Sequence, residues 1–250
     1  GWDNFACRCA VVFALTLKAR AMGYLLRQGG SSVTEKDVIG LAQALLKQEL
    51  TIPDLMQVFD ALHDSMYTDS TRANVRNGVY SAVKRPEYVG ELCTAAKSGG
   101  VFSRYVAISA LDDLSGVDIC AAEAKAGVLD CAGDSSKQIQ ELLLAILPAH
   151  KDWIPDFARM LKSKKAAERL LAVGVSRRLG DALRPQLEEA LATEKSVKVS
   201  DAIRTALGQA AAACGDNAPE SPDALAAQVL KGGKKRKIQW ILDIPLPTLH

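Results

Sequence analysis

The sequence predicts an all-α protein built from repeated helical hairpins, and three observations carry this prediction. Of the 250 residues, 48% are hydrophobic but only 5% are aromatic, and the dominance of alanine and leucine over β-branched residues favours helices over sheets. The phrase IPDLM at residues 52–56 returns as IPDFA at residues 154–158, with proline in the first turn of a helix. Prolines 53, 86, 155, 185 and 222, with one unmarked repeat near Val117, give a period of about 35 residues, the length of a two-helix unit.

The first helical hairpins follow from capping and breaker signals. A hairpin is expected at residues 4–28, ending at Gly29-Gly30, because glycine after a periodic run marks a helix C-terminus. Residues 31–37 then offer N-cap side chains for the next helix. Its apolar positions fall on one helical face, at Val38, Leu41, Ala42, Leu45 and Leu46. Pro53 opens the partner helix.

The remaining units alternate in the same way along the chain. Residues 166–192 give the clearest pattern, with Arg169 and small apolar residues in the first helix and Pro185 in the second. The expected helix pairs are residues 72–84 with 86–97, 102–114 with 117–129, 137–147 with 155–161, 166–179 with 183–192, and 199–213 with 222–230.

A segment of different character follows the repeats. We expect the helical repeats to occupy residues 1–230 and a basic linker with an extended tail to occupy residues 231–250. Pro245 and Pro247 prevent the tail from continuing as a helix. We interpret it as a connection into a further domain or as an arm that docks on a partner. The first residue is Gly1 rather than methionine, which favours an excised fragment or a tag-cleaved product.

Prolines near the start of second helices, with Arg169 and small apolar residues in a first helix, resemble HEAT-like repeats over residues 31–230. The resemblance implies a right-handed α-α superhelix of the HEAT or armadillo type, with about six hairpins whose exposed helix rows form curved surfaces. Trp240 followed by a Leu-Pro-rich tail is also similar to large bacterial proteins related to MolR. Other α-solenoids and a generic helical bundle remain alternatives.

Basic residues concentrate in residues 151–180, although the formal net charge of the chain is only +2. That stretch holds eight Lys or Arg against three acids. Since phosphate binding needs cations gathered on one surface, we expect a candidate stripe for nucleic acid or another anionic partner, with an ordinary solvated face as the alternative. The candidate residues are Arg159, Lys162, Lys164, Lys165, Arg169, Arg177, Arg178, Lys234, Lys235, Arg236 and Lys237.

Motifs for catalysis or cofactors are not found. The cysteines form no C-x-x-C pair, and we interpret them as buried free thiols, with a Cys120–Cys131 disulfide kept as an alternative. His63, His150 and His250 are too far apart for zinc-ligand spacing. The adjacent acids Asp112-Asp113 and Glu188-Glu189 are interpreted as solvated or capping residues. No P-loop, G-x-G-x-x-G or G-x-S-x-G occurs, so we expect no metal, no cofactor and no catalytic residue. The six cysteines are Cys7, Cys9, Cys93, Cys120, Cys131 and Cys214.

The sequence has no run of 18 apolar residues, the minimum for a membrane span. Residues 10–17 are also typical of a signal-peptide core, which we keep as an alternative to a helix of the first hairpin. We expect a cytoplasmic protein, or a nuclear one if the source is eukaryotic.

These observations favour a non-catalytic protein-interaction scaffold, a segment of a larger protein whose partner is another protein or a further domain of the same chain. Neither a membrane nor a small molecule is expected as a partner. Nucleic-acid binding through residues 151–180 and the tail is the alternative. A third hypothesis is a HEAT-fold glycosylase for alkylated DNA bases, with Asp152 and Trp153 beside Lys151 as its site. The competing interpretation packs Trp153 at a repeat interface next to Pro155.

Overall fold

The computed structural model describes residues 14–19, 33–48, 50–66 and 68–208, and within these ranges it contains helices and no strand. The calls on residues 1–13, 20–32 and 209–250, including the basic tail, lie outside the described residues. The α-helices are α2 (Glu35–Leu46), α3 (Ile52–Ser65), α4 (Asp69–Val83), α5 (Val89–Ser98), α6 (Val101–Leu114), α7 (Ala121–Asp130), α8 (Lys137–Ile146), α9 (Ile154–Met160), α10 (Ala166–Leu179), α11 (Arg184–Thr193) and α12 (Val197–Ala206). Short 3-10 turns are η1 (Pro86–Tyr88), η2 (Leu147–Ala149), η3 (Lys151–Trp153) and η4 (Gly180–Leu183).

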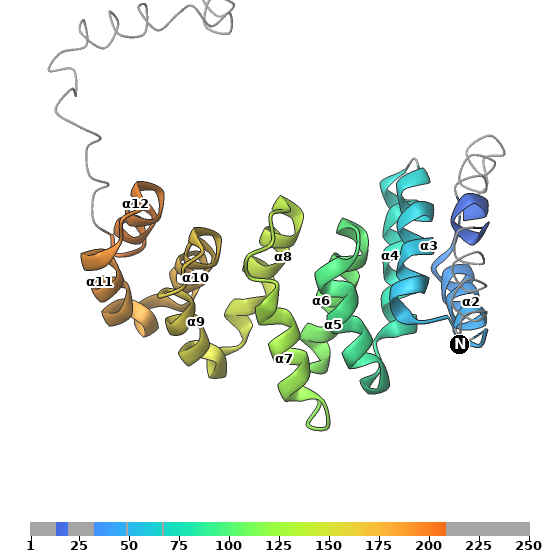
Figure 1. Cartoon of the computed structure of the whole chain (residues 1–250), viewed down its shortest axis with the longest axis horizontal. Helices are drawn as coiled ribbons and strands as arrows, with labels where there is room; N and C mark the ends of the chain where they lie inside the picture. The colour runs from blue at the N-terminus through green and yellow to red at the C-terminus, as the bar shows by residue number, and fades with distance from the viewer. Residues whose placement is uncertain (1–13, 20–32, 49, 67, 209–250) are drawn as a thin grey trace, which may run out of the picture.

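The helices lie in two rows. Each even-numbered helix from α2 to α12 packs on the next even-numbered one, and α3, α5 and α7 pack on one another in the same way. Helices in extensive contact are at most three helices apart in the chain. Figure 1 shows them following one another in chain order along a curved line. The core consists of two clusters of buried apolar residues, a large one from Ala19 to Leu183 and a smaller one that joins Leu161 to α10, α11 and α12.

The predicted hairpins agree closely with the observed ones between residues 35 and 208. Even-numbered helices begin at residues 35, 69, 101, 137, 166 and 197, which are steps of 29 to 36 residues. Pro53, Pro155 and Pro185 lie in the first turns of α3, α9 and α11, as predicted. Pro86 opens the turn η1, which leads directly into α5.

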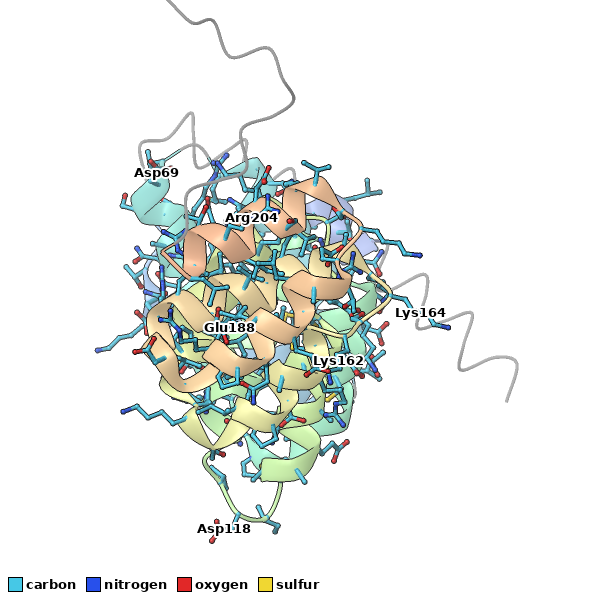
Figure 2. The ribbon with its side chains drawn as sticks, turned by 90° about the vertical axis from the view of Figure 1, so that its left-hand side faces the viewer. Asp69, Asp118, Lys162, Lys164, Glu188 and Arg204 are labelled. Carbon is cyan, nitrogen blue, oxygen red and sulfur yellow. The ribbon has the colours of Figure 1, made fainter. Side chains whose placement is uncertain are left out.

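The prediction of a helix from residue 117 is wrong, since residues 117–120 form a turn and α7 begins at Ala121. The backbone N–H of Val117 bonds to the Leu114 carbonyl and that of Cys120 to the Val117 carbonyl. Ile119 is 85% exposed, so this segment has no apolar face to bury. Figure 2 shows Asp118 at the tip of this turn, which projects from the helical array.

Two glycines allow close approach of neighbouring even-numbered helices. A Cβ at Gly78 in α4 would lie 2.6 Å from the Cβ of Val38 in α2, and 2.9 Å from the backbone oxygen of Glu35. A Cβ at Gly174 in α10 would lie 2.5 Å from a methyl carbon of Leu144 in α8. Only a residue without a Cβ fits such contacts unchanged. The close approach of α2 and α4 therefore depends on Gly78, which faces a Cβ and a backbone oxygen, whereas Gly174 faces the end of a flexible leucine side chain.

We expect Gly78→Ala to lower the free energy of unfolding by about 1 kcal/mol or more, because overpacking at a rigid contact outweighs the better helix propensity of alanine. Gly40→Ala is the matched control, since Gly40 lies in α2 and a Cβ there would meet nothing within 4 Å. The control should gain about 1 kcal/mol from helix propensity. Urea unfolding measures both variants, and equal gains would contradict the close approach.

Candidate functional site

The predicted basic stripe contains several residues that are paired with acids. Lys162 Nζ lies 2.8 Å from Glu189 Oε1, and Lys165 Nζ lies 3.0 Å from Glu168 Oε1. Arg159 forms an ion pair with Asp156 one helical turn away. These acids offset much of the positive charge of the stripe.

Arg169 makes the most extensive of these ion pairs. Its Nε and Nη2 donate to the two carboxylate oxygens of Glu194, at 2.7 and 3.0 Å, and its Nη1 donates to the carbonyl of Ser163 at 2.8 Å. The side chains of Arg169 and Glu194 are only 16% and 5% exposed. Glu194 also accepts from the backbone N–H of Ser196, the N-cap of α12. Arg169 thus joins the start of α10 to the start of α12.

Arg104 makes the same arrangement two hairpins earlier. Its Nε and Nη2 donate to Asp134 at 2.7 and 3.3 Å, and its Nη1 donates to the carbonyl of Gly99 at 2.7 Å. Asp134 accepts from the backbone N–H of Ser136, the N-cap of α8. Arg104 and Arg169 are each the fourth residue of their helix. We call the Arg104–Asp134 and Arg169–Glu194 pairs the inter-hairpin clamps.

Lysine–acid pairs connect the odd-numbered helices in a similar way. The Nζ atoms of Lys97, Lys125 and Lys162 lie 2.6, 2.6 and 2.8 Å from acid oxygens of the next hairpin. The partner acids are Asp130, Asp156 and Glu189 respectively. Each of these lysines therefore links its own hairpin to the next one.

This repetition has a signal in the sequence that the prediction of a basic stripe did not take into account. Residues 97–104 read KSGGVFSR and residues 162–169 read KSKKAAER, with the lysine and arginine seven positions apart in both. The shared spacing identifies Lys162 and Arg169 as residues that hold hairpins together.

The other candidates of the stripe differ in their surroundings. Arg178 donates to the backbone carbonyl of Leu144 at 2.7 Å. Lys164 and Arg177 are exposed and form no ion pair with any described residue. Figure 2 shows Lys164 extending outward at the edge of the array. Lys164, Arg177 and Arg178 are thus the described candidates whose charge is not paired with an acid.

The aromatic residue of the glycosylase hypothesis is buried. Trp153 is 2% exposed, and its ring stacks on that of His150 at a centroid distance of 3.9 Å. Lys125 Nζ lies 5.4 Å from the same ring. The prediction that Trp153 packs at a hairpin interface is confirmed, and its ring has no open face on which a base could stack.

The interpretation of Asp112 as a solvated or capping residue is wrong. Its Oδ1 lies 2.6 Å from Nε2 of His150, and both side chains are about four-fifths buried. Burial raises the pKa of Asp112, and the hydrogen bond to His150 opposes that effect. The pair ties the end of α6 to the turn before α9.

Cys120 and Cys131 are buried, as predicted, and both thiols are free, so the alternative disulfide between them is not formed. Burial raises the pKa of Cys131 to about 12, which keeps this thiol protonated near neutral pH. In the described ranges, no group of three or more His, Cys, Asp or Glu side chains is arranged to hold a metal ion. None of the described helices has the length and apolarity needed to cross a membrane.

A hollow of about 330 Å³ lies where the end of α3 meets α4 and the first turns of α6 and α8. It was not predicted from the sequence, because its residues come from four helices. Its lining includes Asp60, His63, Arg76, Val101, Tyr105 and Gln138. A second hollow of similar volume lies beside the Arg169–Glu194 clamp, where Lys162 and Glu189 also pair with each other.

We call the first hollow the α3–α6 hollow. Asp60 forms part of its floor. Its Oδ1 accepts from the backbone N–H of Ser103 at 3.2 Å, and its Oδ2 accepts from the Ser103 hydroxyl. The N-cap of α6 is Gly100, which has no side chain to cap the helix. Asp60 from α3 therefore takes that role. Burial raises the pKa of Asp60, while the Ser103 hydrogen bonds act in the opposite direction.

His63 forms an adjacent wall. Its ring packs against Phe102 at a centroid distance of 4.7 Å. Its Nδ1 is buried without a hydrogen-bond partner, 3.6 Å from Oδ1 of Asp64. Burial lowers the pKa of His63, an effect that the nearby Asp64 carboxylate partly offsets. The imidazole is therefore neutral at pH 7.

No family model, curated protein or solved structure matches this chain. The geometry is therefore the basis on which function is inferred.

We expect Arg169→Ala to lower the free energy of unfolding by about 2–3 kcal/mol, because it leaves the buried Glu194 carboxylate without its charged partner. Lys164→Ala is the control, since an exposed, unpaired lysine should change stability by no more than about 0.5 kcal/mol. Urea denaturation of both variants gives the comparison. A similar small effect for both would show that the clamp contributes nothing to stability.

The lowered pKa of His63 predicts a pH-dependent contribution to stability. The folded state favours the neutral imidazole, so this contribution is complete above the unfolded-state pKa of about 6.5 and is lost as the pH falls below it. We expect the stability of the protein relative to His63→Gln to decline between about pH 7.5 and pH 5.5. Thermal unfolding at several pH values measures it, and a constant difference would contradict the burial of a neutral His63.

Proposed function

We propose that this chain is a HEAT-like α-solenoid that serves as a non-catalytic protein-interaction scaffold. The observation that carries the proposal is the row of even-numbered helices, in which each helix from α2 to α12 packs on the next even-numbered one along the chain. Such an array leaves long helix faces open to solvent over its whole length. Proteins with stacked helical repeats use these extended surfaces to bind other proteins.

The equivalence of the hairpins supports the repeat assignment. Prolines recur in the first turns of α3, α9 and α11, and the inter-hairpin clamps recur at Arg104 and Arg169. A right-handed superhelix is the arrangement that the HEAT resemblance implies for such units. The relation to MolR-related proteins stays a prediction, because its tail phrase lies outside the described residues.

The surface favours a polypeptide partner over a small molecule. The two hollows of about 330 Å³ are at the low end of the range for ligand pockets. Large apolar side chains are exposed at separate points along the array, among them Leu41, Val101, Ile119 and Val197. A partner that reaches several of these points has to be extended, as another protein or a further domain of this chain would be.

Nucleic acid is the weaker candidate because much of the basic stripe is already engaged. Phosphates would have to compete with Glu189 for Lys162 and with the largely buried Glu194 for Arg169. Lys164, Arg177 and Arg178 remain without an acidic partner, and three cations supply only a small part of the counterion release that drives binding to duplexes.

Two binding measurements test the proposal. In the first, tagged full chain is cross-linked to its partners in cells of its source, and each captured protein is purified and titrated against the chain. We expect a specific complex whose cross-links fall on exposed faces of α2–α12. In the second, fluorescence anisotropy follows a labelled DNA duplex at about 50 and 200 mM salt, conditions under which non-specific binding by cations is readily detected.

The matched variant for the second measurement is Lys164→Glu with Arg177→Glu, which leaves both inter-hairpin clamps in place. We expect little DNA binding by the unaltered chain and no difference in the variant. Salt-sensitive DNA binding that the variant abolishes would favour the nucleic-acid function. Failure of every purified candidate protein to bind would count against the scaffold.

A further inference from the structure

Arg76, on one wall of the α3–α6 hollow, has an unusual set of surroundings. Five arginines are half-buried within the described residues, and four of them donate to or pair with a neighbour. Arg72 donates to the Met66 carbonyl, and Arg204 pairs with Asp201. Arg104 and Arg169 form the inter-hairpin clamps. Arg76 has no hydrogen bond or ion pair in the described structure, and its guanidinium carbon lies 5.1 Å from the centre of the Tyr105 ring.

The guanidinium group of Arg76 therefore has N–H donors that no described protein group uses. An arginine carries five N–H donors and no acceptor, and those of Arg76 are not among the buried atoms that lack a partner, so they reach solvent. The Tyr105 ring lies close enough for a cation–π contact with the guanidinium group, which reduces the ordering needed when a ligand binds. A fork of parallel N–H donors matches the two oxygens of a carboxylate.

The carboxylates already in the hollow leave this fork unoccupied. Both oxygens of Asp60 accept hydrogen bonds from Ser103. Asp64 lies at the rim with its side chain 82% exposed, where water and salt screen its charge. Neither acid forms an ion pair with Arg76. The hollow thus contains a solvent-accessible cation that has no acidic partner among the described residues.

The remaining lining determines the shape of a suitable ligand. Val101 is 39% exposed and, with Phe102, provides an apolar wall beside the polar groups. Gln138 from α8 adds an amide that can donate to an acceptor. A volume of about 330 Å³ suits a side chain with its flanking backbone better than a large cofactor. A short apolar stem with an acidic head group matches these features.

We propose that the α3–α6 hollow is a subsite for an acidic side chain, Asp or Glu, of a polypeptide bound to the scaffold, with Arg76 as its bidentate donor. The proposal rests on the interaction role proposed above and adds the chemical class of the partner segment. The stem of the bound residue contacts Val101 and Phe102, and its carboxylate displaces water from Arg76 and Gln138. Arg76 is then paired as Arg104 and Arg169 are, with the acid supplied by the partner.

The test uses N-acetyl-glutamate N-methylamide as the probe and the uncharged glutamine analogue as its matched control. Arginine Nε–Hε signals of the full chain are followed by NMR during each titration. We expect a saturable shift of the Arg76 signal with the glutamate probe, and binding of the glutamine probe at least about fivefold weaker, about 1 kcal/mol. A single blocked residue should bind in the millimolar range, about −4 kcal/mol.

Two variants assign the effect to the guanidinium fork. Arg76→Lys keeps the charge but lacks the fork, so it should weaken glutamate binding at least about fivefold, read from backbone amide signals of α6. Arg72→Lys, on the same helix, should leave the affinity unchanged. Equal binding of the two probes, unchanged binding by Arg76→Lys, or no saturable shift would overturn the subsite. Because this assay needs no natural partner, a positive result with no partner captured would count against the scaffold alone.

Discussion

Each hairpin of this protein has to bury its apolar faces against the next hairpin, and the rest of the structure depends on that constraint. Close approach at Gly78 sets the distance between α2 and α4. The inter-hairpin clamps then fix how one helix start lies relative to the next, because a bidentate arginine–carboxylate pair tolerates little displacement. Asp60 from α3 likewise fixes the start of α6 by capping its N-terminus. Apolar burial supplies the free energy and these polar contacts select one arrangement.

The same constraint explains why basic residues of this chain resemble a binding stripe. Connecting stacked hairpins requires long cationic side chains that reach from one unit to an acid on the next. Lys162 and Arg169 meet that need as Lys97 and Arg104 do two hairpins before. A count of charges along the sequence cannot separate such residues from a phosphate-binding surface, because the partner acids Glu189 and Glu194 come 25 or more residues later. The role of Lys162 and Arg169 is defined by the acids with which they pair in the fold.

Local signals in the sequence are sufficient to predict the helices, but they do not predict which residues meet on the surface. Prolines, glycines and apolar spacing predicted the hairpins of residues 35–206 with small boundary errors, since these signals act within one helical turn. The prediction of a helix from Val117 is wrong because it rests on the repeat period alone, without support from an N-cap or an apolar face. The pair Asp112–His150 and the hollow around Arg76 depend on how hairpins stack. That stacking joins residues that are far apart in the sequence, such as Asp60 and Gln138 in the hollow, and no local pattern records such a contact.

A surface whose charges are mutually paired gives a partner little to recognise, since every new ion pair requires breaking an old one. Most half-buried cations of this array are in that state, held by the clamps or by backbone carbonyls. Arg76 differs because its guanidinium group contacts the Tyr105 ring and has no acceptor among the described residues. An incoming carboxylate would satisfy existing donors without displacing an acid. An external carboxylate therefore gains more binding free energy at Arg76 than at the arginines that are already paired. In this way the packing of the hairpins determines which part of the surface is selective for an acid.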